Sequence, residues 1–509
     1  MKPALLLLIA SLVFTISFSQ AVYRPAYFDD SSRLEKIKST KAVIDALYQQ
    51  QAEKNHFPGM VYGVMVDGKL AYTGSYGNIN IEKKLAATGS SAFRIASMSK
   101  SFTAMAILQL RDAGKLHLDD AAWKYIPEMK NISYLTSDAP VITIRHLLTH
   151  AAGFPEDNPW GDRQLADTDK DLLQTIGSVS FSNVPGIAYE YSNLGFALLG
   201  KIITNITRMP YQQYIKEHIF IPLGMTHTYY EYAQVPEQML AHGYRWEDNT
   251  WKEEALLHDG AYGAMGGIIT TLEDFSKYMA LHLSAWPPRN EPENKVLKRS
   301  SLREMQKAAN FSGLNARFQF ASGRSCPTAA AYAYGLRWLA DCENRIFVGH
   351  TGGLPGFGSN WTIMPDYGIG VVCFGNVTYA PTATFNLSIL DTLVSMSGLK
   401  KRSIPPSVIL EQRQKELVQL LPEWNKARQS GIFAENFFAD HPLNGLVKES
   451  KDLFEKAGKI ISIEPLVPEN NLRGSFLVKG EKANLMISFT LTPERPALIQ
   501  EYHIREISK

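Results

Sequence analysis

The apolar residues of the first part of the chain follow strand-like and helix-like periods in turn. A helical pattern over residues 32–52 precedes two strand-like runs within residues 59–77, which the turn Val66–Lys69 joins. Another helical pattern runs from about Ser97 to Ala113, and residues 115–290 carry short helical patterns and loops. These patterns predict a helix, two strands, a second helix and then a mostly helical region.

From about Ala331 the apolar positions take up the period of strands. Four runs predict an antiparallel meander, at residues 332–340, 344–350, 358–364 and 368–375. A helix near residues 382–398 would cover the sheet. Because strand patterns lie at both ends of this region, we expect one sheet built from both ends, with a helical subdomain between them. A cleft between sheet and subdomain is the natural place for a functional site.

A different pattern follows residues 398–407, a charged and proline-containing stretch that predicts a domain boundary. Helical patterns near residues 408–429 and 443–457 come before four strand-like runs. These runs are residues 458–464, 472–479, 484–492 and 498–506. The order predicts a small C-terminal α+β domain, which looks like the NTF2-like cone fold.

Residues 1–20 carry one lysine and then an almost unbroken apolar run. The run is typical of a secretory signal peptide and is short for a membrane span, which is the alternative. We therefore expect a signal peptide over residues 1–20, a main domain over 21–400 and an accessory domain over 401–509. The protein should be exported, either periplasmic or secreted, without a stable membrane anchor.

Charge and cysteine content narrow the possible partners. A formal net charge of +2 over 509 residues gives no basic field for nucleic acid, so we expect no nucleic-acid partner. The three cysteines are too widely spaced for a metal framework, and we expect no metal site and no cofactor. Cys326 and Cys342 flank a strand-like run and could form a disulfide, whereas Cys373 has the surroundings of a buried core residue. The oligomeric state stays open.

The stretch RIASMSKSFTA places Ser97 and Lys100 at the start of a predicted helix. Their spacing puts both side chains on one helical face. A helix start also offers free backbone N–H groups, which suit a nucleophile whose target becomes an oxyanion. A neutral lysine could take the serine proton. The alternative is an ordinary helix cap with a solvated lysine, because this short motif also arises by chance.

A second stretch, YEYSNLGFALLG, contains Tyr191 and Asn193. In an extended loop, residues two apart point the same way, so a phenol and an amide would face one cleft. The phenol could relay a proton, while the amide could hold a substrate carbonyl or orient the lysine. A surface loop before a helix is the alternative.

The third stretch, FVGHTGGLPGFGSNW, contains His350, Thr351, Gly352 and Gly353 at the end of a predicted strand. The two glycines would let a substrate backbone approach and pair with the strand edge. A backbone N–H here could complete an oxyanion hole. The alternative is a glycine-rich hairpin turn.

Taken together, S-x-x-K, Y-x-N and H-T-G in this order resemble the serine β-lactamase and penicillin-binding-protein superfamily. The closest branch is the class C-like one, with its D-alanyl-D-alanine carboxypeptidases, D-aminopeptidases and esterases. Further similar stretches are residues 110–128, 142–155, 219–228 and 263–279. The resemblance covers residues 33–398 and implies an α+β, β-lactamase/transpeptidase-like fold, in which helices flank an antiparallel sheet and a helical subdomain is added.

The resemblance also implies roles for these residues. Ser97 would be the acylated nucleophile, and Lys100 and Tyr191 would share the base and acid work, in an order that the sequence leaves open. Asn193 would contact the substrate amide. The backbone N–H groups of Ser97 and Gly353 would form the oxyanion hole.

One departure from the family pattern affects the expected substrate. β-Lactamases of this branch usually carry lysine where this chain has His350, and a histidine is mostly neutral at pH 7. His350 would line the site and assist proton transfer or substrate binding, beside the substrate-binding residues Thr351 and Gly352.

We therefore expect an exported serine hydrolase that acts through an acyl-enzyme on an amide or ester. The leading substrate is a D-amino-acid-containing, cell-wall-type peptide, including peptidoglycan fragments. A carboxylesterase or class C-like β-lactamase is the alternative. An alternative of another class is a non-catalytic protein that binds cell-wall fragments or β-lactams.

Overall fold

The structure is a computed structural model that describes residues 23–320 and 322–508, so the predicted signal peptide lies outside the described residues. The chain divides into two compact units. The larger spans Phe28–Arg402, and the smaller comprises the chain from Ser403 onward together with the residues just before Phe28. Within the described residues, none of the helices combines the length and the apolarity needed to cross a bilayer.

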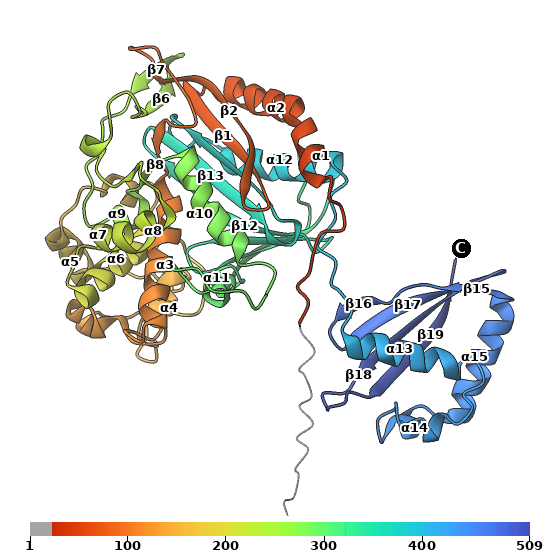
Figure 1. Ribbon diagram of the computed structural model, residues 1–509. Helices are drawn as coiled ribbons and strands as arrows, with labels where there is room; N and C mark the ends of the chain where they lie inside the picture. Colours follow the sequence, from red (N-terminus) through yellow and green to blue (C-terminus); the bar gives the residue numbers. More distant parts are fainter. Residues whose placement is uncertain (1–22, 321, 509) are drawn as a thin grey trace, which may run out of the picture. The chain divides into compact units, whose positions relative to one another are not determined.

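A nine-stranded antiparallel sheet forms the centre of the larger unit (Figure 1). As predicted, it is built from both ends of the unit, because β1 pairs with both β2 and β14. Its strand order is β3-β2-β1-β14-β13-β12-β11-β10-β9. The strands are β1 (Gly59–Val66), β2 (Lys69–Asn80), β3 (Leu85–Ala86), β9 (Asn310–Asn315), β10 (Thr328–Tyr332), β11 (Arg337–Asp341), β12 (Ile346–Leu354), β13 (Phe357–Met364) and β14 (Ile369–Gly375).

Both faces of the central strands are covered, and each face has its own hydrophobic core. Alternation along β1 sends Met60 and Val64 to the core beneath α2 and α12, and sends Val61 and Met65 to the core beneath α10. The predicted helix over 32–52 is divided in two. The covering helices are α1 (Arg33–Ser39), α2 (Lys41–Lys54), α10 (Leu272–Ser284) and α12 (Thr382–Met396).

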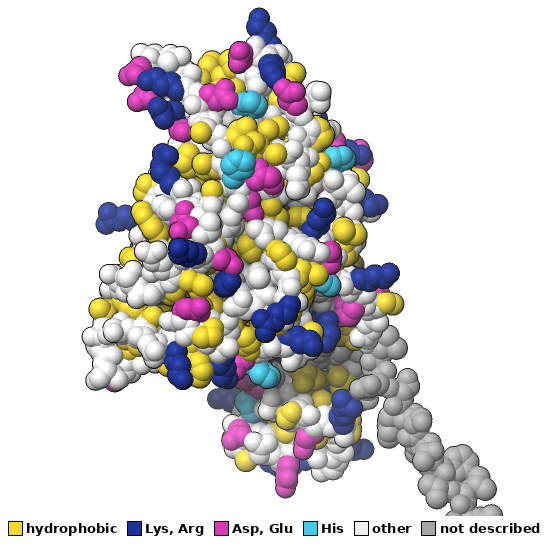
Figure 2. Space-filling view, turned by 90° about the vertical axis from the view of Figure 1, so that its left-hand side faces the viewer, with side chains coloured by type: hydrophobic (Ala, Val, Ile, Leu, Met, Phe, Trp, Pro, Cys, Tyr) yellow, Lys and Arg dark blue, Asp and Glu magenta, His cyan; other side chains and the backbone are white. Residues whose placement is uncertain are grey.

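The helical subdomain surrounds α3 (Ser99–Asp112), which is buried along most of its length and contacts α6 and α9. The other helices are α4 (Ile144–Leu148), α5 (Asp169–Gly177), α6 (Asn193–Thr207), α7 (Tyr211–Ile215), α8 (Ile221–Leu223), α9 (Gly263–Gly266) and α11 (Arg299–Met305). Short strands complete this part, namely β4 (Ala92–Arg94), β5 (Thr228–Tyr229), β6 (Tyr244–Glu247), β7 (Thr250–Glu253) and β8 (Ile269–Thr271). On the face in Figure 2, acidic and basic side chains are interspersed, in line with the small net charge.

The prediction of one strand over residues 332–340 is wrong, because the chain turns between β10 and β11. Gly335 occupies the left-handed region at φ 65°, and a Cβ on it would lie 2.7 Å from the Lys100 carbonyl oxygen. Only glycine suits this turn. The turn places Tyr332 and Arg337 beside the start of α3.

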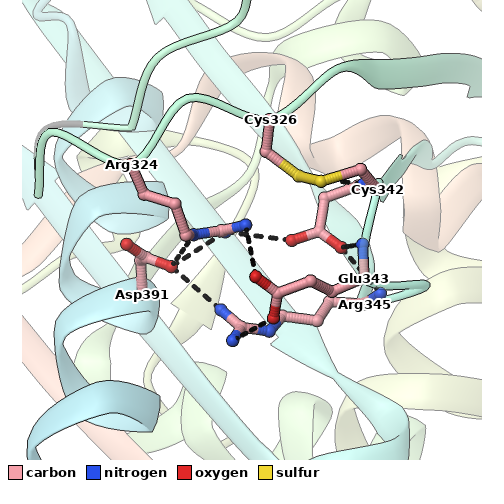
Figure 3. Close-up of a disulfide and its surroundings, with 7 residues drawn as sticks. Arg324, Cys326, Cys342, Glu343, Arg345 and Asp391 are labelled. Atoms are coloured by element: carbon pink, nitrogen blue, oxygen red, sulfur yellow. Dashed lines mark hydrogen bonds and ion pairs between the residues drawn. A yellow bond between two sulfur atoms is a disulfide. The ribbon is translucent and has the colours of Figure 1, made fainter.

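A disulfide closes the opposite end of the β10–β11 hairpin (Figure 3). Cys326 and Cys342 are bonded, with their Cα atoms 5.6 Å apart. The structure therefore contains the bond that the sequence left open. Cys373 is buried and free, as predicted.

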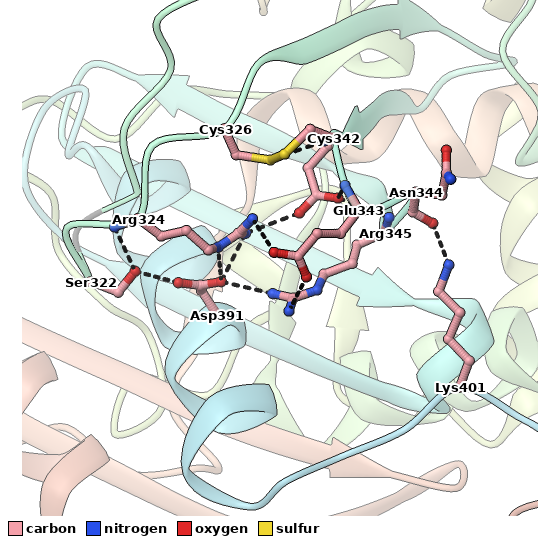
Figure 4. Close-up of polar contacts among 10 residues, drawn as sticks. Ser322, Arg324, Cys326, Cys342, Glu343, Asn344, Arg345, Asp391 and Lys401 are labelled. Atoms are coloured by element: carbon pink, nitrogen blue, oxygen red, sulfur yellow. Dashed lines mark hydrogen bonds and ion pairs between the residues drawn. A yellow bond between two sulfur atoms is a disulfide. The ribbon is translucent and has the colours of Figure 1, made fainter. Parts of the chain in front are cut away.

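Ion pairs reinforce the same end of the hairpin and tie it to α12 (Figure 4). Arg324 Nη2 lies 2.9 Å from both Asp341 Oδ2 and Asp391 Oδ1, and Arg345 Nη1 lies 3.0 Å from Asp391 Oδ1. Glu343 contacts both arginines. The disulfide and these ion pairs hold the hairpin at the end remote from Tyr332.

The smaller unit has an antiparallel sheet with a core of its own. The order is β15-β17-β18-β19, and β16 also pairs with β17. Its elements are α13 (Val408–Leu420), α14 (Phe437–Asp440), α15 (Leu443–Ala457), β15 (Ile460–Ile463), β16 (Val467–Asn470), β17 (Arg473–Gly480), β18 (Asn484–Leu491) and β19 (Ile499–Ile507).

Two predictions for this unit need correction. The helix predicted over 408–429 ends at Leu420, because Leu421 precedes Pro422 and is extended, at ψ 146°. Strand β16 was not predicted, since Pro468 interrupts its pattern; proline is tolerated at such a sheet edge. The NTF2-like assignment stays a prediction.

Candidate active site

Ser97 lies in a single 3₁₀ turn, Ala96–Met98, that leads into α3. Ala96 has φ 50°, a conformation that residues with a Cβ rarely adopt and that often occurs at functional sites. Strand β12 passes close by, since a Cβ on Gly352 would lie 2.2 Å from the Ile95 carbonyl oxygen. The glycine therefore lets the strand approach the backbone just before Ser97.

Lys100 reaches three acceptors from a fully buried position. Its Nζ lies 2.9 Å from Ser97 Oγ, 2.7 Å from Asn193 Oδ1 and 3.0 Å from the Met265 carbonyl oxygen. A neutral amine has two N–H groups and one lone pair. The N–H groups can serve Asn193 and Met265, which leaves the lone pair for the Ser97 hydroxyl.

Burial shifts the pKa values of the two candidate proton carriers in opposite directions. It lowers the pKa of Lys100 to about 7, while the carboxylates of Asp162 and Asp157 act against this fall. Burial raises the pKa of Tyr191 well above 10, with a hydrogen bond to Ser97 acting in the opposite direction. At neutral pH the lysine can accept a proton, whereas the phenol keeps its own.

Hydrogen bonds at the start of α6 hold the Asn193 backbone and side chain in place. Asp157 accepts hydrogen bonds from the backbone N–H groups of Asn193 at 2.7 Å and Leu194 at 2.8 Å. The Asn193 side chain donates through Nδ2 to Asn158 Oδ1 at 2.7 Å. Because both ends of the amide are engaged, its oxygen stays directed at Lys100.

Strand β12 has an open edge beside Ser97. It pairs with β13 over Val348–Leu354, but with β11 only over Ile346–Gly349. On the β11 side, the predicted substrate-binding residues Thr351–Gly353 therefore have no partner strand within the described part of the chain. An extended peptide could add to this edge.

His350 is buried and uses both ring nitrogens within the protein. Nδ1 lies 2.6 Å from the Thr351 carbonyl oxygen, so it carries the proton and donates; Nε2 lies 2.8 Å from the Tyr332 hydroxyl, from which it accepts. Burial lowers the pKa of His350 well below 6.5, so the ring is neutral at pH 7. Its ring centre is 6.3 Å from that of Tyr191.

Sequence reasoning missed Arg337 of β11. Its guanidinium carbon lies 5.6 Å from the Tyr191 ring centre, and the residue is exposed. Among the described residues, no hydrogen bond or ion pair engages this side chain. It lines a cavity of ≈ 160 Å³ together with Tyr189, Tyr332, His350 and others. The lone arginine in the apolar run AYAYGLRWLA was the signal that could have identified it.

His150 was also missed as a neighbour of the site. Its ring centre lies 4.4 Å from that of Tyr191 and 4.3 Å from that of Tyr332. Its Nδ1 accepts from the Ser192 backbone N–H at 3.1 Å. Neutral aromatic groups thus surround the Tyr191 phenol, which explains why its charged form is so unfavourable.

Comparison with known proteins settles the family. The family profile described as Beta-lactamase matches residues 44–393. The chain belongs to the Beta-lactamase family. The expected relationship to serine β-lactamases and penicillin-binding proteins is therefore confirmed.

Curated relatives of this Beta-lactamase-family protein include Protein flp of Staphylococcus aureus (strain MW2), 29% identical over 352 residues. The match covers 68% of this chain and 65% of that protein. Beta-lactamase-like protein 2 of Dictyostelium discoideum is 30% identical over 253 residues, or 48% of this chain and 46% of that protein. The chain thus spans about two-thirds or less of these relatives' own lengths.

A solved structure confirms the fold of the Beta-lactamase-family protein. The octameric penicillin-binding protein homologue from Pyrococcus abyssi superimposes with a TM-score of 0.59 at 20% identity. The match covers 91% of this chain and 99% of that one. The α+β fold with an added antiparallel-sheet domain is thus found in another protein.

Proposed function

We propose that this protein is an exported serine hydrolase that forms an acyl-enzyme on Ser97, with D-amino-acid-containing, cell-wall-type peptides as the leading substrates. The observation that carries the proposal is the contact of 2.9 Å between Lys100 Nζ and Ser97 Oγ, at a lysine whose pKa is about 7. The apolar pattern of residues 1–20, typical of a signal peptide, supports the proposed export.

The first chemical step moves one proton and forms one bond. Lys100 Nζ takes the hydroxyl proton of Ser97 while Oγ attacks the substrate carbonyl carbon. The backbone N–H groups of Ser97 and Gly353 stabilise the resulting oxyanion. When the carbon–leaving-group bond breaks, Tyr191 gives its proton to the leaving group and regains one from Lys100. Water then hydrolyses the acyl-enzyme by the reverse proton path.

Two features support a peptide with a free carboxylate as the substrate. The open edge of β12 over Thr351–Gly353 suits an extended backbone. The neutral ring of His350 offers no charge to a carboxylate, whereas the Arg337 guanidinium has its donors available beside Tyr191. A carboxypeptidase-like or amidase-like activity fits this arrangement best.

Fluorescent penicillin tests the nucleophile directly. We expect a covalent adduct on the wild-type protein, seen by fluorescence and by intact mass, and no adduct on Ser97→Ala. Ser101→Ala is the matched control, because Ser101 belongs to the same helix but donates to the Met98 carbonyl oxygen instead. Failure of penicillin, chromogenic esters and D-amino-acid amides alike to acylate the wild-type protein would sink the proposal.

Carboxylesterase action is the second candidate. The neutral His350 favours it, because no fixed charge at that position requires an anionic substrate. Turnover of neutral esters without any turnover of D-amino-acid peptides would establish this alternative. A lasting adduct with no turnover of any ester, amide or lactam would instead favour a non-catalytic binding protein.

A further inference from the structure

A carboxylate and a phenol form a hydrogen bond beside the proposed catalytic residues, and neither was predicted from the sequence. Asp162 lies in the short turn Gly161–Arg163 of the helical subdomain, and Tyr379 follows strand β14 of the central sheet. The Tyr379 hydroxyl donates a hydrogen bond of 3.0 Å to Asp162 Oδ2. The contact joins residues 217 positions apart, from the two walls of the site.

Each partner of this contact also touches part of the catalytic machinery. A Cβ on Gly353 would lie 2.8 Å from Tyr379 Cδ1, so the phenol ring rests against the β12 backbone. On the other wall, a Cβ on Gly161 would lie 2.9 Å from the Asn193 Cβ. The turn that carries Asp162 therefore packs against the residue that accepts from Lys100.

The backbone at Tyr379 is held in an unfavourable conformation. Its φ is 51°, in the left-handed region that bulky residues rarely occupy. Such strain persists only where surrounding contacts enforce it, and it concentrates at functional positions. Here the hydrogen bond to Asp162 is one of the enforcing contacts.

Asp162 itself is almost fully buried, at 1% exposure. Its second oxygen, Oδ1, has no hydrogen-bond partner among the described residues. Burial raises the pKa of Asp162 to about 6, and the strongest opposing influence is Lys100. Conversely, Asp162 is the strongest of the groups that oppose the fall in the pKa of Lys100. Each group is thus the main electrostatic partner of the other.

Other charged or titratable groups face this pair from the neighbouring elements. Acidic groups come from the loop before the Asp162 turn, one cation comes from β11, and neutral rings come from the loop before α6, the end of α4 and β12. These are Asp157, Glu156, Arg337, Tyr191, His150 and His350.

We propose that Asp162, held by Tyr379, is a positioning residue that supplies the counter-charge for Lys100 while Lys100 carries the Ser97 proton. In this step one proton moves from Ser97 Oγ to Lys100 Nζ, and Asp162 stays ionised and forms no covalent bond. The inference rests on the proposed role of Lys100 as the base.

A direct titration of Lys100 tests the inference without any substrate. The full-length protein is labelled with ε-¹³C lysine, and the Lys100 signal is assigned by its loss in Lys100→Arg. In Asp162→Asn, which keeps an acceptor for Tyr379, the midpoint of Lys100 should move to lower pH because a nearby negative charge is lost. Asp167→Asn is the matched control, since this carboxylate is not among the largest influences on the pKa of Lys100, and the Lys100 midpoint should move little in this variant.

Tyr379→Phe provides an independent variant. Without the hydroxyl donor, Asp162 holds its proton to higher pH, so the Lys100 midpoint should again move down, by less than in Asp162→Asn. An unmoved midpoint in a folded Asp162→Asn protein overturns the inference. If that variant does not fold, an unmoved midpoint in Tyr379→Phe overturns it.

The pH dependence of Ser97 acylation separates this inference from the proposed function. If wild-type Ser97 is acylated, the acid limb of the rate should move down in Asp162→Asn together with the Lys100 midpoint. A uniform loss of rate at every pH would indicate a structural role and overturn the inference. A moved midpoint in a protein that no acyl donor labels would reject the hydrolase function and leave the Asp162–Lys100 coupling intact.

Discussion

Two polar clusters lie near opposite ends of the β10–β11 hairpin, and the cations in them are paired differently. Beside the disulfide, Arg324 pairs directly with Asp341 and Asp391 at 2.9 Å. At the active site, Lys100 contacts only uncharged acceptors, and the carboxylate of Asp162 acts on it without a direct hydrogen bond. Basic and acidic side chains are therefore paired directly in one place and kept from direct pairing in the other.

Arg324 and Lys100 differ in the interactions that compensate the effect of burial on their pKa values. Partial burial acts to lower the pKa of Arg324, but hydrogen bonds to Asp391 and Asp341 outweigh it, and the pKa rises. Lys100 has no such bond to a carboxylate, and its pKa falls to about 7. A guanidinium keeps its proton at every physiological pH, and direct pairing reinforces this for Arg324, whereas a buried lysine without a direct carboxylate bond can exchange one.

The largest effect should come from giving Lys100 a permanent charge. Lys100→Arg should lower the rate of Ser97 acylation on the order of a thousandfold, because a guanidinium cannot accept a proton. In the wild type, acylation requires neutral Lys100, so the rate should fall as pH drops through about 7. Rates of ester acylation from pH 5 to 9 measure both effects. A wild-type rate that stays flat across this range would contradict the role of Lys100.

The next largest effect should come from Arg337, a cation without the carboxylate partners that Arg324 has. Arg337→Gln should raise KM for substrates with a free carboxylate by about tenfold to a hundredfold, the worth of a charge-assisted hydrogen bond. Neutral esters are the internal control and should keep their KM. An equal change for both substrate types would indicate a general disturbance of the pocket.

The disulfide end should affect stability rather than catalysis. Replacing both cysteines, by Cys326→Ser with Cys342→Ser, should lower the free energy of unfolding by about 2–4 kcal/mol in urea titrations. Acylation of Ser97 in the folded protein should change by less than about twofold. A large loss of acylation at unchanged stability would show that the two ends of the hairpin are coupled.

The smallest effect should come from Arg324→Lys, the reciprocal of the first substitution. A lysine keeps the charge but loses the forked geometry that serves two carboxylates, at a site where 22% of the arginine side chain is exposed. We expect a loss of about 1 kcal/mol in the free energy of unfolding and unchanged acylation. A loss of acylation comparable to that of Lys100→Arg would remove the distinction between the two clusters.

Local patterns predicted most of the larger unit, because the periods of strands and helices depend on residues that are close together in the sequence. The split of residues 332–340 escaped them, since the turn at Gly335 depends on its close approach to the Lys100 carbonyl. In the site, local motifs identified Ser97, Lys100 and Asn193, and the structure brings these side chains into contact. Their catalytic roles stay predictions.

Physical reasons explain why the remaining site residues were not predicted. Asp162 and Tyr379 lie in irregular segments with no distinctive spacing, and their relation exists only through a contact between distant parts of the chain. Arg337 had a visible signal, but its proximity to Tyr191 depends on the turn that was missed.

The open edge of β12 has a consequence for solubility. Unpaired strand edges attract other strands and promote aggregation, and soluble proteins commonly shorten or cover them. Here β11 covers the strand up to Gly349, so only the few residues around Thr351–Gly353 are left unpaired by it. An opening of this length is long enough for a short peptide, but it offers few backbone hydrogen bonds to a strand of a second molecule. So short an unpaired edge can stay exposed with little tendency toward fibril-like assembly.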